Sequence, residues 1–167
     1  SNGDGFAKGI EFFWRDKKTI KNIDYWISYS YLDSKRDFIN YTQPLFPNFA
    51  AKHTLNIVAK KFVTSWKTGF NLSYNYSHGR PYYNFVNQSG STVLLNSGTI
   101  KDNKTLNFSM NYLPNLGKKD AKSFAVWVLS VNNVLGTKNE FGYQFSSDGL
   151  KSSTIKNPDA FNVSGFC

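Results

Sequence analysis

The chain has 167 residues, the length of one ordinary domain, and 17% of them are aromatic, with fifteen Phe, ten Tyr and four Trp. Its mean hydropathy is -0.44, and its longest purely apolar run is FAVWVL at 124–129. A transmembrane helix needs about 20 apolar residues, so that class of membrane protein is excluded. The strands of a membrane β-barrel leave no such run, so that class stays open.

The formal net charge of +9 suggests an acidic partner, such as nucleic acid or an anionic membrane surface. The lysines, however, gather where turns are expected, in three groups: Lys17, Lys18 and Lys21; Lys60, Lys61 and Lys67; Lys118, Lys119 and Lys122. No RNA-binding signature or zinc-ligand spacing accompanies them, so we expect solvated turns and no nucleic-acid partner. The single cysteine, Cys167, excludes an intramolecular disulfide.

Period-two alternation predicts seven strands, in chain order at about 6–17, 22–33, 52–63, 67–78, 102–113 and 122–133, with a last one within 157–167. The links between them alternate in length. Those at 18–21, 64–66 and 114–121 are short, and those at 34–51, 79–101 and 134–154 are long and irregular. The strand at 122–133 is apolar on both faces, so its sides cannot be assigned. No helix is predicted.

Two stretches, FNLSYNYS at 70–77 and LNFSMNYL at 106–113, show the alternation most clearly. Each predicts a strand with two unlike faces. The apolar residues, which we expect to face lipid, are Phe70, Leu72, Tyr74, Tyr76, Leu106, Phe108, Met110 and Tyr112. The small polar residues, which we expect to line a wet lumen, are Asn71, Ser73, Asn75, Asn107, Ser109 and Asn111.

Strand length and loop sorting favour a membrane barrel over a soluble one. Globular strands average about 5–6 residues, whereas a tilted bilayer-crossing strand needs about 9–11. Alternating short and long connections are typical of outer-membrane barrels, with tight periplasmic turns and long extracellular loops. We therefore predict an all-β fold, an antiparallel transmembrane β-barrel segment of about seven long strands. The alternative is a soluble lipocalin-like or sandwich domain that buries the same apolar rows.

Bacterial single-chain barrels have an even number of strands with both ends in the periplasm, so seven strands that start from outside cannot close alone. Their first and last edges would be left unpaired in lipid, which is prohibitive. The whole of 1–167 is thus expected to be the C-terminal part of a larger barrel, or to pair with other chains. The chain begins with Ser1 and has no signal peptide, which fits a processed chain or a piece of a longer one.

An ordered set of segments also resembles a known family. GFAKGIEFFWRDK, YWISYSYLDSKRDF, KHTLNIVAKKF, GFNLSYNYSHGRPYYN and VLSVNNVLGTKNEFGYQFSSDG resemble the last strands of TonB-dependent outer-membrane receptors, particularly those of Bacteroidetes. The similarity spans about residues 3–155. Each segment alone is weak, because alternation produces much of it, but the ordered set is fairly specific. Two features depart from the family: the plug domain, TonB box and earlier strands are absent, and the chain stops at SGFC, so Phe166 is only penultimate.

The resemblance implies a twenty-two-strand barrel in the outer membrane of a Gram-negative bacterium, with an N-terminal plug. It implies active uptake of a scarce solute, such as a siderophore, haem, a vitamin, a glycan or a peptide. The implied partners are outer-membrane lipid and lipopolysaccharide, the rest of the barrel and its plug, TonB through the missing N-terminal part, and a surface lipoprotein or larger outer-membrane complex.

The long loops supply the candidate ligand-binding residues, since loops at the outer face meet the solute. They are Arg80, Tyr82, Tyr83, Phe141, Tyr143 and Phe145. Arginine could pair with an anionic ligand and the aromatic rings could stack on a flat one. The alternative for each is packing between loops or contact with lipopolysaccharide. Glu11 and Arg15 share one predicted lumen wall, either as part of a charge ladder or as a plain salt bridge.

No catalytic or cofactor pattern is found. His53 and His78 lie near predicted strand ends, and a lone histidine is more often a polar surface residue than a metal ligand. Paired carboxylates, a nucleophile elbow, a glycine-rich phosphate loop and HExxH are all missing from the sequence. We therefore expect no enzyme, no metal and no cofactor. Two functions remain as alternatives to uptake: a scaffold in an outer-membrane complex and a soluble β-barrel binding module.

Overall fold

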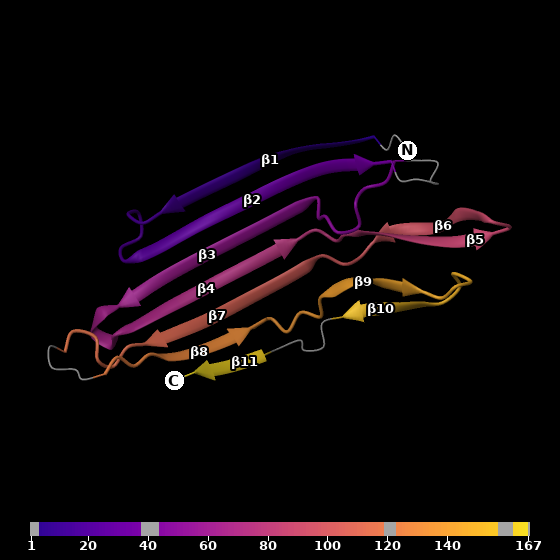
Figure 1. Ribbon diagram of the computed structural model, residues 1–167. Helices are drawn as coiled ribbons and strands as arrows, with labels where there is room; N and C mark the ends of the chain where they lie inside the picture. The colour runs from indigo at the N-terminus through magenta and orange to yellow at the C-terminus, as the bar shows by residue number, and fades with distance from the viewer. Residues whose placement is uncertain (1–3, 38–43, 119–122, 157–161, 167) are drawn as a thin grey trace.

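The computed structural model describes residues 4–37, 44–118 and 123–156 and the backbone of 162–166. Seven antiparallel strands form one sheet, in the order β1-β2-β3-β4-β7-β8-β11 (Figure 1). Their bounds are β1 Gly5–Asp16, β2 Ile23–Arg36, β3 His53–Val63, β4 Thr68–Ser77, β7 Asn103–Tyr112, β8 Trp127–Asn132 and β11 Asn162–Phe166. The prediction of an all-β, antiparallel fold is confirmed.

Two further hairpins lie where only irregular loops were expected. β5 (Pro81–Gln88) pairs with β6 (Ser91–Thr99), and β9 (Glu140–Phe145) pairs with β10 (Ser152–Lys156). The stretches at 79–101 and 134–154 therefore contain four strands that the prediction missed. Among the described residues the one helical element is η1 (Thr64–Trp66), a single 3-10 turn, and no helix there is long and apolar enough to cross a membrane.

The register confirms which side chains share a face. Phe70 lies opposite Met110, Leu72 opposite Phe108, and Tyr74 opposite Leu106. The same side continues through β3, β2 and β1, where the rung through Tyr74 holds Ile57, Ile27 and Trp14. It also settles β8, whose sides the sequence left open, because Trp127, Leu129 and Val131 lie opposite Tyr112, Met110 and Phe108. One apolar face thus extends over six neighbouring strands.

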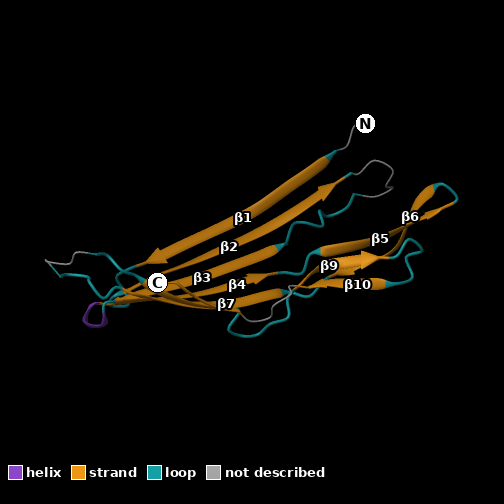
Figure 2. Ribbon diagram, turned by 60° about the horizontal axis from the view of Figure 1, so that its bottom comes forward, coloured by secondary structure: helices purple, strands orange, loops and turns teal. Residues whose placement is uncertain are grey.

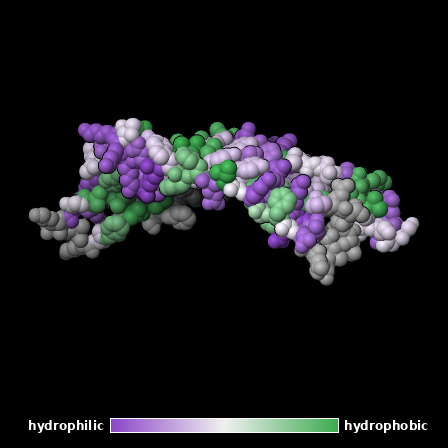
Figure 3. All heavy atoms as spheres, turned by 90° about the horizontal axis from the view of Figure 1, so that it is seen from above, coloured by the Kyte–Doolittle hydropathy of each residue, from purple (hydrophilic) through white to green (hydrophobic). Residues whose placement is uncertain are grey.

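The sheet is a single layer with no core of its own. Figure 3 shows it as a thin arched layer with hydrophobic and hydrophilic residues both at the surface. Ile10 is 69% exposed and Leu72 45% exposed, although both lie within long strands. The buried hydrophobic residues of the described chain are Val86, 7% exposed, and Ile100, 4% exposed, and both lie outside the sheet.

The sheet does not close into a barrel. In the described part of the chain β1 and β11 are its two edges, each paired on one side. β8 begins at Trp127 rather than near 122, and β11 occupies only part of the last predicted strand; residues 119–122, 157–161 and 167 lie outside the described residues. Lys60 and Lys61 were expected in a turn but lie within β3.

Candidate functional site

The long connections gather at one end of the sheet and form a packed unit, which we call the loop cap. It consists of the β5–β6 and β9–β10 hairpins and the segment 44–50. The two hairpins extend beyond the ends of β4 and β7 (Figure 2), while the connections at 17–22 and 64–67 and the described parts of the third, 113–118 and 123–126, lie at the opposite end of the strands. The connections predicted to be long therefore lie at one end of the sheet and those predicted to be short at the other, but the link between β7 and β8 is longer than predicted because β8 begins only at Trp127.

Three of the predicted ligand residues meet inside the loop cap. The ring centroid of Tyr82 lies 4.9 Å from that of Tyr143 and 5.9 Å from that of Phe145, and Tyr143 lies 6.4 Å from Phe145. On its own hairpin the Tyr82 ring lies over Gly98, where a Cβ would come within 2.8 Å of its hydroxyl oxygen. This aromatic triad joins the two hairpins across about 60 residues of sequence, because edge-to-face and tilted rings attract beyond the area they bury.

A buried polar contact lies beside the triad. The Asn84 side chain is 1% exposed and donates a hydrogen bond from Nδ2 to the carbonyl oxygen of Gly149 at 2.9 Å. Gly149 has a φ of 71°, and a Cβ there would lie 2.5 Å from Cγ1 of Val86 and 3.0 Å from Cδ2 of Leu95. The turn of β9–β10 therefore needs glycine both for its backbone and for its close approach to β5.

Charged groups lie at the base of the loop cap. Lys101 Nζ is 3.2 Å from Oε1 of the buried Glu140, and the Tyr143 hydroxyl is 3.4 Å from Oε2. Loss of solvent, followed by the nearby Glu140 carboxylate, raises the pKa of Tyr143. The Nε of Arg80 is buried without a hydrogen-bond partner among the described residues. A buried guanidinium nitrogen without an acceptor is costly, so Arg80 is the group here that an anionic ligand would satisfy most directly.

The other two loop candidates lie apart from the triad. Tyr83 points to the opposite side of β5 and donates to the carbonyl oxygen of Phe46 at 3.0 Å, and burial raises its pKa. Phe141 is 50% exposed. The register of β9 against β10 passes over it, since Lys156 lies opposite Glu140 and Ile155 opposite Gly142. This bulge takes Phe141 out of the alternation that grouped it with Tyr143 and Phe145.

The polar face of the sheet carries hydrogen bonds between side chains of neighbouring strands. Asn71 Nδ2 donates to Ser109 Oγ at 3.2 Å, and Asn107 Nδ2 is 3.5 Å from Ser73 Oγ. The register places the remaining predicted members of this face, Asn75 and Asn111, on the same side, opposite Thr105 and Val128. The six residues predicted to line a lumen therefore do share one face.

Arg15 on this face pairs with Asp24 rather than Glu11. Its Nε donates to Oδ1 at 2.8 Å, and its guanidinium lies 5.4 Å from the Trp26 ring. Lys60 Nζ lies 5.0 Å from the same ring. Asp24 is within reach because it lies on the neighbouring strand, two residues from Trp26, which is opposite Arg15. Glu11 lies four residues from Arg15 along the same extended strand, which is too far for an ion pair. The idea of an Arg15–Glu11 wall salt bridge was wrong.

Aromatic rings border the apolar face at its two ends, as the tyrosines near the predicted strand ends, Tyr25, Tyr76 and Tyr112, already indicate in the sequence. Near the short connections they are Trp14, Tyr25, Phe70, Tyr112 and Trp127. Trp14 and Tyr25 touch edge to face at 5.3 Å. Near the loop cap the rings are those of Tyr29, Tyr31, His53 and Tyr76. The members of these rows come from different strands, and the register places them side by side.

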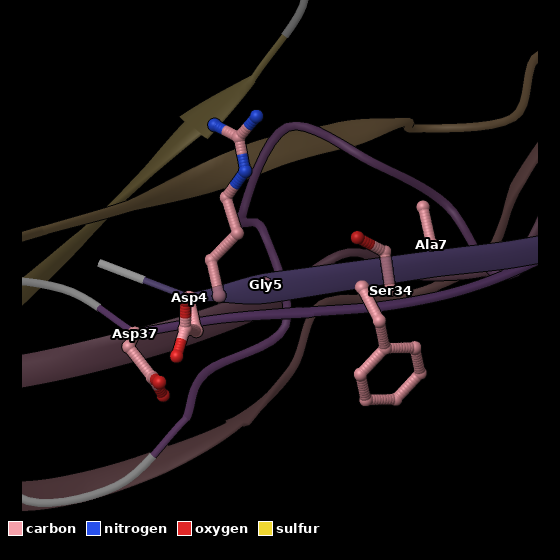
Figure 4. A pocket seen from close by; sticks show the side chains of 7 residues that line it. Asp4, Gly5, Ala7, Ser34 and Asp37 are labelled. Carbon is pink, nitrogen blue, oxygen red and sulfur yellow. The ribbon is translucent and has the colours of Figure 1, made fainter. Parts of the chain in front are cut away.

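A hollow of about 450 Å³ lies at the start of β1. In Figure 4 the Asp4 and Asp37 side chains lie near each other beside Gly5, and Ser34 and Ala7 lie farther along the strands. The amide of Asp37 donates to the carbonyl of Asp4 at 2.8 Å. The lining of the hollow comes from the start of β1 and the end of β2.

The comparisons with known proteins give no relative. No protein-family model matches the sequence, and a search of curated proteins finds no match. The features of the structure that bear on function are the apolar face of the sheet and the loop cap.

Proposed function

We propose that the chain forms part of the wall of an outer-membrane β-barrel, in a TonB-dependent receptor that takes up a scarce solute. The observation that carries this proposal is the apolar face, which extends over six strands without a covering layer among the described residues. Rings at both ends of the face support it, since aromatic girdles mark the two interfaces of a bilayer.

The energetics of the face favour lipid over water. Burying one Val, Leu, Ile or Phe side chain is worth about 1.5–3 kcal/mol, and a soluble protein rarely exposes a contiguous apolar patch beyond a few hundred Å². Here apolar side chains that are exposed or half-buried follow one another from Ile10 on β1 to Leu129 on β8. A soluble barrel or sandwich would need a second layer on this side. A bilayer supplies that layer from outside the chain.

Strand length fits the same environment. At about 3.3 Å per residue, the ten residues of β4 span roughly 33 Å along the strand, which is the length that a tilted crossing needs. A barrel strand tilted by about 35–45° must cross an apolar band about 25 Å tall. The free edges of β1 and β11 then pair with strands outside this sheet, because unpaired edges are prohibitive in lipid.

This arrangement assigns the loop cap to the outside of the cell. Short connections are periplasmic and long ones extracellular in such barrels. The loop cap would then meet the solute before the lumen does, with Arg80 and the aromatic triad as its contact groups. The step from barrel to TonB-dependent uptake comes from the family resemblance of the strand segments.

Spin-label scanning of Phe70–Tyr76 tests the barrel proposal. Labels are placed one at a time, after Cys167→Ser, in the protein inserted into phospholipid vesicles. Collision with oxygen, which concentrates in lipid, should peak at 70, 72, 74 and 76, and collision with a water-soluble nickel chelate at 71, 73 and 75. The opposite phase, or nickel access at every position, would refute it.

The gene upstream of Ser1 separates uptake from the scaffold function. A plug domain and a TonB box there would support energised uptake. A gene that lacks both would overturn it and leave a scaffold role in an outer-membrane complex.

A further inference from the structure

The two histidines of the chain meet at the end of the sheet near the loop cap. His53 is the first residue of β3, and His78 follows Ser77, the last residue of β4. The register places Thr54 opposite Ser77, and the amide of His78 donates to the carbonyl of His53 at 2.9 Å. The two residues are therefore direct cross-strand neighbours, and their ring centroids lie 5.9 Å apart.

A carboxylate holds the His78 ring. Nδ1 of His78 lies 3.1 Å from Oδ1 of Asp102. The same carboxylate accepts hydrogen bonds from the Gly79 amide at 2.9 Å and from the Tyr76 hydroxyl at 2.8 Å, so its position is fixed. An imidazole whose Nδ1–H donates to a carboxylate keeps a free electron pair on Nε2. That arrangement is the usual outer shell of a metal-binding histidine.

A tyrosine holds the His53 ring in the matching way. Nδ1 of His53 lies 2.8 Å from the hydroxyl of Tyr29 on β2, and the Tyr31 ring packs against the imidazole at 5.1 Å between centroids. When Nδ1 carries the proton it donates to the Tyr29 oxygen, and Nε2 is then free to bind a metal. Both imidazoles thus have one nitrogen engaged by a fixed partner and one nitrogen available.

We propose that Nε2 of His53 and Nε2 of His78 bind one divalent transition-metal ion, with Tyr29 and Asp102 holding the rings from behind. With metal–nitrogen bonds of about 2.0–2.1 Å, two imidazoles on one ion have centroids roughly 5–6 Å apart, and the observed 5.9 Å fits. Imidazole suits zinc, copper and nickel.

The proposed site leaves part of the coordination sphere of the metal ion unfilled. No group of three or more His, Cys, Asp and Glu side chains is placed to hold a metal in the described part of the chain. Two protein ligands leave the other coordination positions to water or to a donor from outside. The site also lies at the loop-cap end, where β2, β3, β4 and the segment before β7 meet. A metal ion there joins these elements and can accept an external ligand at the same time.

Copper binding by untagged protein in detergent, carrying Cys167→Ser to remove the thiol, tests the proposal. Since the chain has two histidines, every imidazole signal comes from this pair. We expect one Cu²⁺ per chain, with an electron paramagnetic resonance spectrum coupled to two nitrogens. His53→Gln and His78→Gln should each remove one nitrogen. Asp102→Asn should keep both nitrogens and weaken binding by about 10–100-fold, as the loss of an outer-shell partner does.

Two results would overturn the proposal: unsaturable binding by the unsubstituted protein, or equal copper affinity in the His53→Gln, His78→Gln double variant. Circular dichroism without metal shows whether each variant folds. Should a variant misfold, the unsubstituted protein still decides the matter. Bound Zn²⁺ should protect both histidines from diethyl pyrocarbonate, and equal modification with and without Zn²⁺ would contradict the site. The result is independent of the uptake function.

Discussion

The sheet and the loop cap differ in how much of their side-chain surface they bury within the chain. In the sheet, long strands leave large apolar side chains such as Ile10 and Leu72 in contact with their surroundings. In the loop cap, short hairpins bury Asn84 and Val86 against the turn at Gly149. The same chain therefore contains one region with a buried core and one sheet whose apolar face has no covering layer among the described residues.

This difference separates two sources of stability. Packing within the chain stabilises the loop cap, so its residues should respond to cavities, clashes and lost hydrogen bonds as any protein core does. The sheet is held by its ladder and, under the proposed function, by lipid on one side. Its residues should respond to polarity on that face and tolerate changes of shape. Substitutions in the two regions should therefore fail in different assays.

The largest expected effect is a charge on the apolar face. Leu72→Arg should cost about 2–4 kcal/mol of folding free energy in a bilayer, as arginine does near the midplane of a barrel wall. Ser73→Arg, one residue along on the polar face, should cost far less. The measurement is the fraction of full-length protein that reaches a heat-modifiable, folded form in the outer-membrane fraction. Equal assembly of both variants would show that the two faces do not differ in environment.

A methyl group at the loop-cap turn should come next. Gly149→Ala combines left-handed backbone strain of about 1–2 kcal/mol with overpacking of about 1–3 kcal/mol against Val86 and Leu95. Hydrogen exchange should show faster opening of β5 and β9 and unchanged protection of β3 and β4.

Gly90 is the matched control for that substitution. It also has a positive φ, 83°, but a Cβ there would meet nothing within 4 Å. Gly90→Ala should therefore show the strain alone, about 1–2 kcal/mol, confined to the tip of β5–β6. If the two alanine variants behave alike, the contact between the hairpins contributes little, and the loop cap is not a packed unit.

Most of the sheet could be predicted from the sequence because alternation runs along the long strands β1, β2, β3, β4 and β7, each of ten or more residues. FNLSYNYS and LNFSMNYL already contain the faces that the register pairs, Phe70 with Met110 and Asn71 with Ser109. Pattern alone is enough when one face is apolar and the other is polar throughout. It fails at β8, where both sides are apolar, and there only pairing with β7 decides.

The loop cap could not be predicted, because its order comes from contacts between distant segments. The hairpins alternate weakly, and a bulge interrupts each of them, between Asn84 and Phe85 and beside Phe141. Tyr82 and Tyr143 were proposed as separate ligand contacts, and nothing in their spacing showed that they meet. The sequence did contain one signal for the β9–β10 hairpin, because Gly149 follows Asp148 and an Asp-Gly pair is typical of hairpin turns. The cross-strand pair His53–His78 was missed because its register depends on the strand ends.

The smallest expected effect is a pH response limited to the loop cap. Hydrogen bonds from the Ser146 hydroxyl and from the Leu150 amide, the latter at 3.0 Å, hold the pKa of Asp148 below its usual value. A carboxyl with a depressed folded pKa contributes stability that is fully present above its unfolded pKa of about 3.9 and is lost as pH falls through the folded value. Below about pH 4 the Leu150 amide should therefore exchange faster, and the turn that presents Gly149 to Asn84 should loosen.

The control is Asp148→Asn, which keeps a hydrogen-bond acceptor without the ionisation. In that variant the exchange of the Leu150 amide should not depend on pH in this range beyond the intrinsic rate. Because strands β3 and β4 hold no such turn, their protection should stay constant, and a parallel loss there would mean that the two regions are not independent.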